Sequence, residues 1–201
     1  MSRRFVIGDA LARKLFVVGV NGGQTTDMVR ADSAGFGAVA AVEIDGRRGD
    51  LWVAGAAGAL HRLQLVSGRP LKTYHTAPAA GAVQFTDLAV APSGTVIGLD
   101  AEGQRLLTLG RGADTLTPAL SLNLPGARSF ALDDEDSGYV ADSTGLARVD
   151  LRSHAVAPVS AGDGVDLTGL ERIRLHHGAL IALQRADGAA RIIRLELTSG
   201  G

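Results

Sequence analysis

The sequence predicts an all-β protein, a β-propeller of four-stranded antiparallel blades with about five blades present. A strand, turn and strand phrase returns every 41 to 46 residues along the 201-residue chain, and a period of about 40 to 50 residues is typical of propeller blades. The chain has 27 glycines and only 4% aromatic residues, so small aliphatic side chains must fill most of the core, which suits closely stacked sheets. The five phrases begin at Phe5, Leu51, Val96, Tyr139 and Leu180.

Composition and charge exclude several classes of partner. The 20 Lys and Arg residues nearly balance the 21 Asp and Glu residues, so no broad positive field favours nucleic acid. No apolar run reaches the roughly 20 residues that span a bilayer, and residues 1–9 lack the long apolar segment of a signal peptide. We therefore expect no nucleic-acid partner, no membrane span and no signal peptide in the chain as given, whereas a longer parent would be compatible with a periplasmic or secreted location.

Residues 39–78 show the blade pattern most clearly. Residues 41–45 alternate apolar and acidic side chains, residues 51–54 form an apolar run after a Gly-rich turn, and residues 60–65 alternate again. Residues 69–76 supply a fourth, outer strand. We therefore expect a single propeller domain over 1–201, with blades at 1–32, 39–78, 84–124, 128–161 and 167–201.

The third and fourth blades repeat this arrangement with polar turns between their strands. For the third blade we expect strands at 86–91, 95–99, 105–109 and 116–122, and for the fourth at 130–133, 138–141, 146–151 and 155–160.

The two ends of the chain break the pattern. The first copy has strands at 5–8, 14–19 and 26–30 and lacks its innermost strand, and the last has strands at 171–175, 180–184 and 191–197 and lacks its outer strand. Closed propellers usually avoid such open edges. The simplest expectation is a piece of a six-bladed ring with about one blade upstream. A five-bladed ring with an incomplete seam is the alternative.

One phrase carries a resemblance to a known family. Residues 96–106, with Asp100 and Arg105, resemble the strand, Asp, loop, Arg, strand phrase of NHL-type repeats, and the segments around Asp9 and Asp142 are looser versions. Over nearly its whole length the chain is similar to the senescence-marker-protein, gluconolactonase and luciferin-regenerating-enzyme-like propellers. We expect each of these Asp side chains to accept backbone N–H groups of its turn and to pair with a nearby Arg or Lys.

The resemblance implies a divalent cation in members with lactonase activity. Those members hold calcium or magnesium in the central channel with Glu, Asn and Asp oxygens. Here Asn21 falls in a hairpin and Asn123 at the end of an outer strand, which weakens the lactonase assignment.

Three carboxylates on inner strands remain as candidate site residues. Asp87 and Glu171 each lie seven positions before a turn glycine, which predicts equivalent blade positions and a shared role as metal ligands or as an acid and base pair. Glu43 is a further candidate metal ligand. The alternative for Asp87 and Glu171 is that they are solvated strand ends or pair with neighbours such as Arg172 and Arg174, and the alternative for Glu43 is that it faces only the adjacent blade.

The histidines give a weaker signal. His176 and His177 occupy the turn after the last inner strand, and a propeller resembling streptogramin lyase uses a channel histidine as its base. His61, His75 and His154 lie on outer positions and are expected to be structural.

Two function classes remain open. The first is a binding or scaffold module of unknown ligand, which takes a small molecule or a protein on its funnel face. The second is a metal-dependent hydrolase of lactones or related esters, with a calcium or magnesium ion held by Asp87 and Glu171. The sequence leaves open whether the protein is an enzyme.

Overall fold

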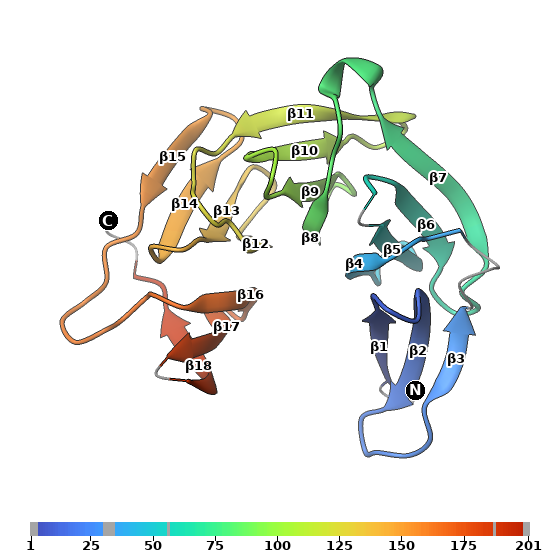
Figure 1. Cartoon of the computed structure of the whole chain (residues 1–201), viewed down its shortest axis with the longest axis horizontal. Coiled ribbons are helices and arrows are strands. Elements are labelled where there is room, and N and C mark those ends of the chain that lie inside the picture. The colour runs from blue at the N-terminus through green and yellow to red at the C-terminus, as the bar shows by residue number, and fades with distance from the viewer. Residues whose placement is uncertain (1–3, 30–34, 56, 187, 199–201) are drawn as a thin grey trace.

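Five blades of antiparallel strands, here called the first to fifth sheets, follow one another around an open arc, and the second and third are joined into one sheet of eight strands (Figure 1). The computed structural model describes residues 4–29, 35–55, 57–186 and 188–198. Within these residues the only helical segment is one 3-10 turn, η1 (Pro78–Ala80), and none of them forms a helix long and apolar enough to cross a membrane. The predicted all-β fold, a β-propeller, is confirmed.

The strands follow the predicted repeat closely. Every predicted strand lies within two residues of an observed one, and Arg30, the last residue predicted for the third strand, is outside the described residues. The sheets are β1 (Arg4–Asp9), β2 (Lys14–Gly19) and β3 (Thr26–Val29); β4 (Val39–Asp45), β5 (Asp50–Gly55), β6 (Leu60–Gln64) and β7 (Pro70–Thr76); β8 (Phe85–Val90), β9 (Val96–Asp100), β10 (Arg105–Leu109) and β11 (Thr115–Ser121); β12 (Ser129–Leu132), β13 (Ser137–Ala141), β14 (Leu146–Asp150) and β15 (Ala155–Pro158); and β16 (Leu170–His176), β17 (Ala179–Ala186) and β18 (Ala189–Glu196).

The second and third sheets are joined at their outer edges, which the repeat did not predict. β7 and β11 pair in parallel through two ladder positions, His75 with Thr115 and Thr76 with Leu116. The Ala77 N–H extends the contact by donating to the Leu116 carbonyl at 3.2 Å. This pairing covers part of two strand edges that would otherwise be open.

The hydrophobic core lies between successive sheets. Each of four apolar clusters is shared by two neighbouring sheets, as where Trp52 and Leu60 of the second sheet pack with Phe85 and Leu88 of the third. Fully burying a side chain of this size contributes about 1.5–3 kcal/mol. Packing between blades therefore sets their order around the arc and brings the inner strands β4, β8, β12 and β16 toward its centre (Figure 1).

The repeated Asp residues cap their turns, as expected. Asp9 accepts the Ala12 N–H at 2.7 Å, and Asp100 and Asp142 each accept a turn glycine N–H at 3.0 Å. The expected ion pair forms at Asp100, whose Oδ2 accepts Arg105 Nε at 2.9 Å. Among the residues that the structure describes, Asp9 of the first sheet forms no such ion pair, and Lys14 pairs instead with Asp27 at 3.2 Å.

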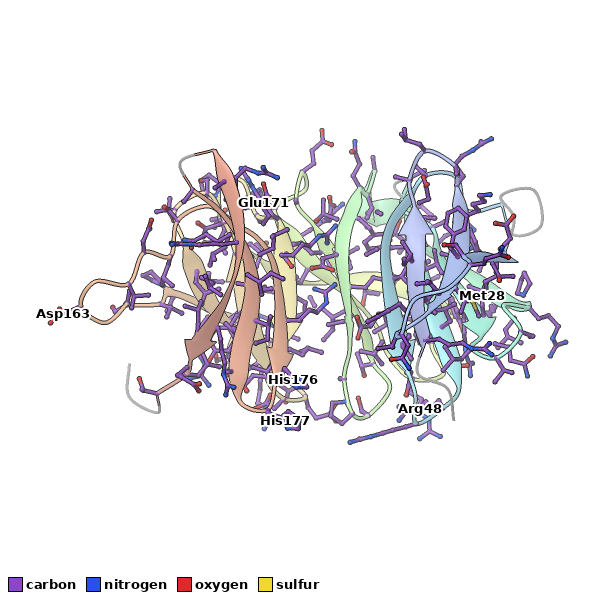
Figure 2. The ribbon with its side chains drawn as sticks, turned by 90° about the horizontal axis from the view of Figure 1, so that it is seen from below. Met28, Arg48, Asp163, Glu171, His176 and His177 are labelled. Carbon is purple, nitrogen blue, oxygen red and sulfur yellow. The ribbon has the colours of Figure 1, made fainter. Side chains whose placement is uncertain are left out.

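Hydrogen bonds between turns join three consecutive blades, the second to the fourth, on one face of the arc. Arg48 Nη1 pairs with Asp45 at 2.8 Å, while its Nη2 reaches the carbonyls of Pro92 and Ser93 at 3.0 and 2.6 Å. The Ser93 N–H in turn donates to Glu135 Oε1 at 2.6 Å. Figure 2 shows Arg48 at the same end of the molecule as His176 and His177.

Removing the Arg48 side chain tests this connection. We expect Arg48→Ala to lower the free energy of unfolding by about 1–2 kcal/mol, because it deletes charge-assisted bonds to the next blade. The side chain of the exposed neighbour Arg47 makes no hydrogen bond or ion pair with the described residues, so Arg47→Ala should stay within about 0.5 kcal/mol. Urea unfolding measures both, and equal losses in the two variants would contradict the bridge.

Candidate functional site

The register of the inner strands brings five polar residues toward the centre of the arc. β-Bulges interrupt the start of β4, β8 and β16. Asp87 and Arg172 are the first paired residues beyond the bulges in β8 and β16, and Ser129 has the same place in β12. Side chains alternate along a strand, so the residues two positions further, which include Glu43 and Arg174, face the same side of their sheets. We call these five residues the axial cluster.

Asp87 is the anchor of the axial cluster. Its residue is 0% exposed, and both carboxylate oxygens are fully engaged. Oδ1 accepts the Leu88 N–H at 3.0 Å and Arg174 Nη2 at 2.8 Å. Oδ2 accepts the Ser129 hydroxyl, the Phe130 N–H at 3.0 Å and Arg174 Nη1 at 2.9 Å. The bidentate pair with Arg174 compensates the cost of burying this charge.

Two arginines of β16 cross the centre of the arc to reach this carboxylate. Arg172 Nη1 donates to the Thr86 carbonyl at 3.1 Å and lies 3.4 Å from Asp87 Oδ1. The side chains of Arg172 and Arg174 are nevertheless 48% and 45% exposed. Among the described residues, Arg172 Nε and Nη2 have no acceptor. The cluster thus holds two guanidinium groups in fixed positions while leaving donor groups of Arg172 unused by the protein.

Glu43 adds a titratable group beside the arginines. Burial raises the pKa of its carboxyl to about 7, and nearby Asp87 adds to the rise while Arg174 opposes it. Glu43 lies directly across the ladder from Trp52, so the two side chains share a face of the sheet and the indole helps to exclude water. Near neutral pH this carboxyl is therefore a mixture of charged and neutral forms.

Glu171 lies apart from the axial cluster, contrary to its predicted equivalence with Asp87. It is the bulged residue of β16, the position that Thr86 takes in β8. Its carboxylate accepts Arg185 Nε at 2.8 Å, and this bond lowers the pKa of Glu171. The residue equivalent to Asp87 is Arg172. Counting back from the turn glycine failed because the turns after the two strands differ in length, and a shift of one residue exchanges the faces of a strand.

The described residues do not assemble a metal site of side chains. No three His, Asp or Glu residues within them lie close enough together to hold an ion. His176 and His177 are exposed at the end of β16, opposite the end that carries Glu171 (Figure 2), and their rings contact each other edge to face at 4.2 Å between centroids. His61 is buried, and its Nδ1 forms a hydrogen bond with Thr73 Oγ1 at 3.0 Å. Its ring also packs against Phe36, which fits its predicted structural role.

Arg172, Arg174 and Ser129 are the members that the sequence did not identify as site residues. The arginines flank buried Ile173, so their alternation in an inner strand was the available signal. Nothing in the sequence indicated that Ser129 would link two strands: its hydroxyl donates to Asp87 and accepts the Ile173 N–H at 3.1 Å.

Two depressions lie away from the centre of the arc. One, of about 910 Å³, is mostly apolar and lies between the first and second sheets, where Val6, Met28 and Val66 contribute to its walls. The other, of about 450 Å³, includes His154 and Asp142. The Asp142 carboxylate already caps its own turn, where it accepts hydrogen bonds from the N–H groups of Thr144 and Gly145. The larger depression is also lined by the oppositely charged residues Arg4 and Asp27, and Asp27 forms an ion pair with Lys14 of the same sheet.

Comparisons with known proteins bear on the fold. No family model matches the sequence, and no curated protein matches it. The structure resembles that of virginiamycin B lyase from Staphylococcus aureus, with a TM-score of 0.64 and 13% identity over 98% of this chain and 68% of that one. It also resembles a protein of unknown function from Bacteroides thetaiotaomicron, with a TM-score of 0.69 and 11% identity over 96% of this chain and 56% of that one.

A third similar structure is the computationally designed Ika8 protein, with a TM-score of 0.59 and 12% identity over 96% of this chain and 55% of that one. The chain therefore spans little more than half the length of two of these three structures. At such identities the likeness concerns the fold alone. It does not identify the senescence-marker-protein and gluconolactonase family that the sequence resembles. The chain is a β-propeller module.

Proposed function

We propose that this chain is a β-propeller binding module that holds a small anionic molecule at its axial cluster. The observation that carries the proposal is the half-exposed Arg172 side chain, whose Nε and Nη2 donate to no acceptor among the described residues. A guanidinium group offers a planar fork that matches a carboxylate, sulfate or phosphate.

The charges of the cluster favour an anion over a cation. Arg172 and Arg174 supply two positive charges, and Asp87 neutralises one of them. Glu43 neutralises only part of the other near neutral pH, because its pKa is about 7. A ligand carboxylate or sulfate would complete the charge balance. A small ligand fits better than a broad protein surface, since the donors belong to inner strands near the centre of the arc.

No observation in the described part of the chain favours the alternative of a lactone or ester hydrolase. A cation at Asp87 needs an oxygen lone pair that faces the ion. Both Asp87 oxygens already accept hydrogen bonds, and two guanidinium groups lie against them. Glu171, the second proposed ligand, is paired with Arg185 on β17. Asp87 is thus better suited to hold the arginines than to bind calcium or magnesium.

Sulfate binding tests the proposed anion site, because sulfate stays doubly charged across the neutral range. We expect millimolar sulfate at pH 6 to raise the Tm of the protein and to bind saturably in calorimetry. Arg172→Gln should weaken this binding at least tenfold, since one forked donor is worth about 1.5–3 kcal/mol when its partner is charged. The fold should survive because the polar interactions of the Arg172 side chain with the described residues are one hydrogen bond to Thr86 and one ion pair with Asp87.

Arg111→Gln is the matched control, since Arg111 is exposed in the turn between β10 and β11 and its side chain makes no hydrogen bond or ion pair with the described residues. It should bind sulfate as the wild type does. Sodium chloride at equal ionic strength separates specific binding from general screening. Equal sulfate affinity in wild type and Arg172→Gln would contradict the proposal, as would the absence of saturable binding in both.

A further inference from the structure

Glu43 lies at the level of the axial cluster where an anion would meet Arg174. Its ladder position in β4 is equivalent to that of Arg174 in β16, two residues beyond the first paired position after the bulge. The two side chains therefore project from different inner strands at the same height. No described residue donates a hydrogen bond to the Glu43 carboxylate. Both the ionised carboxylate and an incoming anion would therefore be stabilised by the positive charge of the Arg174 guanidinium.

The charged surroundings of Glu43 are few and defined. Arg174 from β16 attracts its negative form, and Asp87 from β8 repels it. On the strand beside it, Trp52 is directly opposite and uncharged. Asp45, the next residue on the same side of β4, is already paired with Arg48 at 2.8 Å. Arg174 is thus the positive group that stabilises ionised Glu43.

We infer that Glu43 competes with the bound anion for Arg174, so that the axial cluster takes up a fraction of a proton from solution for each anion that it binds just above neutral pH. This inference deepens the proposed function and rests on it. With Glu43 neutral, Asp87 is the only negative group that remains in the cluster. The two arginines then give the cluster one net positive charge. With Glu43 ionised, the cluster is neutral and a negative ligand must approach a second carboxylate. The raised pKa of Glu43, about 7, places this change in the physiological range.

Proton uptake is a balanced exchange. At low pH the anion binds to a cluster in which Glu43 is already protonated, so no proton is exchanged. Between the pKa of Glu43 in the free cluster, about 7, and its higher pKa in the bound cluster, part of the Glu43 carboxylate population gains a proton from the buffer as the anion binds. Above both pKa values Glu43 stays ionised and the anion binds more weakly. The affinity should therefore fall as pH rises through about 7, by linkage between the two sites.

Sulfate calorimetry at pH 6.0 and 8.5 tests the inference. For the wild type we expect about tenfold weaker binding at pH 8.5 than at pH 6.0. The reason is that a rise of about one unit in the pKa of Glu43 on anion binding corresponds to a factor of about ten in affinity. At pH 7.5, where a pKa shift of this size gives the largest proton uptake, the apparent binding enthalpy should differ between two buffers of unlike ionisation enthalpy.

Glu43→Gln should bind sulfate equally at both pH values, with the affinity that the wild type has at pH 6.0, and should show no buffer dependence. Glu102→Gln is the matched control, because Glu102 is exposed in the turn between β9 and β10 and should leave the pH dependence of the wild type intact. Trp52, the only tryptophan of the chain and a neighbour of Glu43, gives a second readout, since its fluorescence should titrate near pH 7 in wild type but not in Glu43→Gln.

The outcomes separate the two proposals. Sulfate binding that depends on Arg172 but not on pH would overturn the role of Glu43 and leave the anion site standing. Binding that depends on pH equally in wild type and Glu43→Gln would assign the proton to another group and also overturn the inference. No saturable sulfate binding at either pH would refute the proposed function itself, and with it the inference.

Discussion

Replacing Asp87 by alanine is expected to lower the free energy of unfolding by about 3–5 kcal/mol, the largest effect of any single change in the axial cluster. Removing one partner of a buried ion pair leaves the other charge uncompensated. Asp87 is fully buried, and five hydrogen bonds from β8, β12 and β16 end on its two oxygens. Urea unfolding followed by Trp52 fluorescence measures the loss.

A double variant keeps this prediction testable if Asp87→Ala is too unstable to purify. Asp87→Ala combined with Arg174→Ala removes both charges, so it should be more stable than the sum of the two single losses predicts. Asp114→Ala removes an exposed carboxylate that pairs with Lys72 and should have little effect. A loss below about 1 kcal/mol in Asp87→Ala would show that this carboxylate does not hold the inner strands together.

Replacing Asp100 by alanine should cost about 2–4 kcal/mol, more than the same change at Asp142. Asp100 is 1% exposed and accepts bonds from Gln84, Gly103 and Arg105. Arg105 itself bridges to the carbonyls of residues 80 and 82, so its guanidinium would keep its cost of burial and lose its counter-charge.

Asp142 provides the comparison within the same repeat. It caps its turn through Thr144 and Gly145 but has no arginine partner among the described residues. Asp142→Ala should therefore cost only about 1–2 kcal/mol, the usual value for a lost turn or cap bond. Equal losses at Asp100 and Asp142 in urea unfolding would mean that the Arg105 ion pair adds nothing beyond the turn.

The strands were predictable because each depends on local signals. Alternation of apolar side chains and glycine turns fixes a strand within a few residues, and residues 105–109 were predicted with the bounds that β10 has. The pairing of β7 with β11 was not predictable, since it joins strands about 40 residues apart through two ladder positions and leaves no periodic trace in the sequence.

The candidate site was predictable only in part. Asp87 and Glu43 were named from the sequence, and both belong to the axial cluster. Glu171 was misplaced because the turn after β16 is shorter than the turn after β8, so counting back from the turn glycine reached the bulged residue, which pairs with Arg185. Arg172 and Arg174 were considered only as neighbours of the carboxylates. Their reach across the arc to β8 depends on how the blades curve, which residue spacing within one strand does not encode.

The measurement that tests the account most directly is a crystal structure with selenate, an anomalous scatterer with the shape and charge of sulfate, grown at pH 6. The account predicts an anomalous peak within hydrogen-bond distance of Arg172 and Arg174, lost in Arg172→Gln. Selenate found only at other surface arginines, with both cluster side chains covered or turned away from solvent, would contradict an anion site at the centre of the propeller.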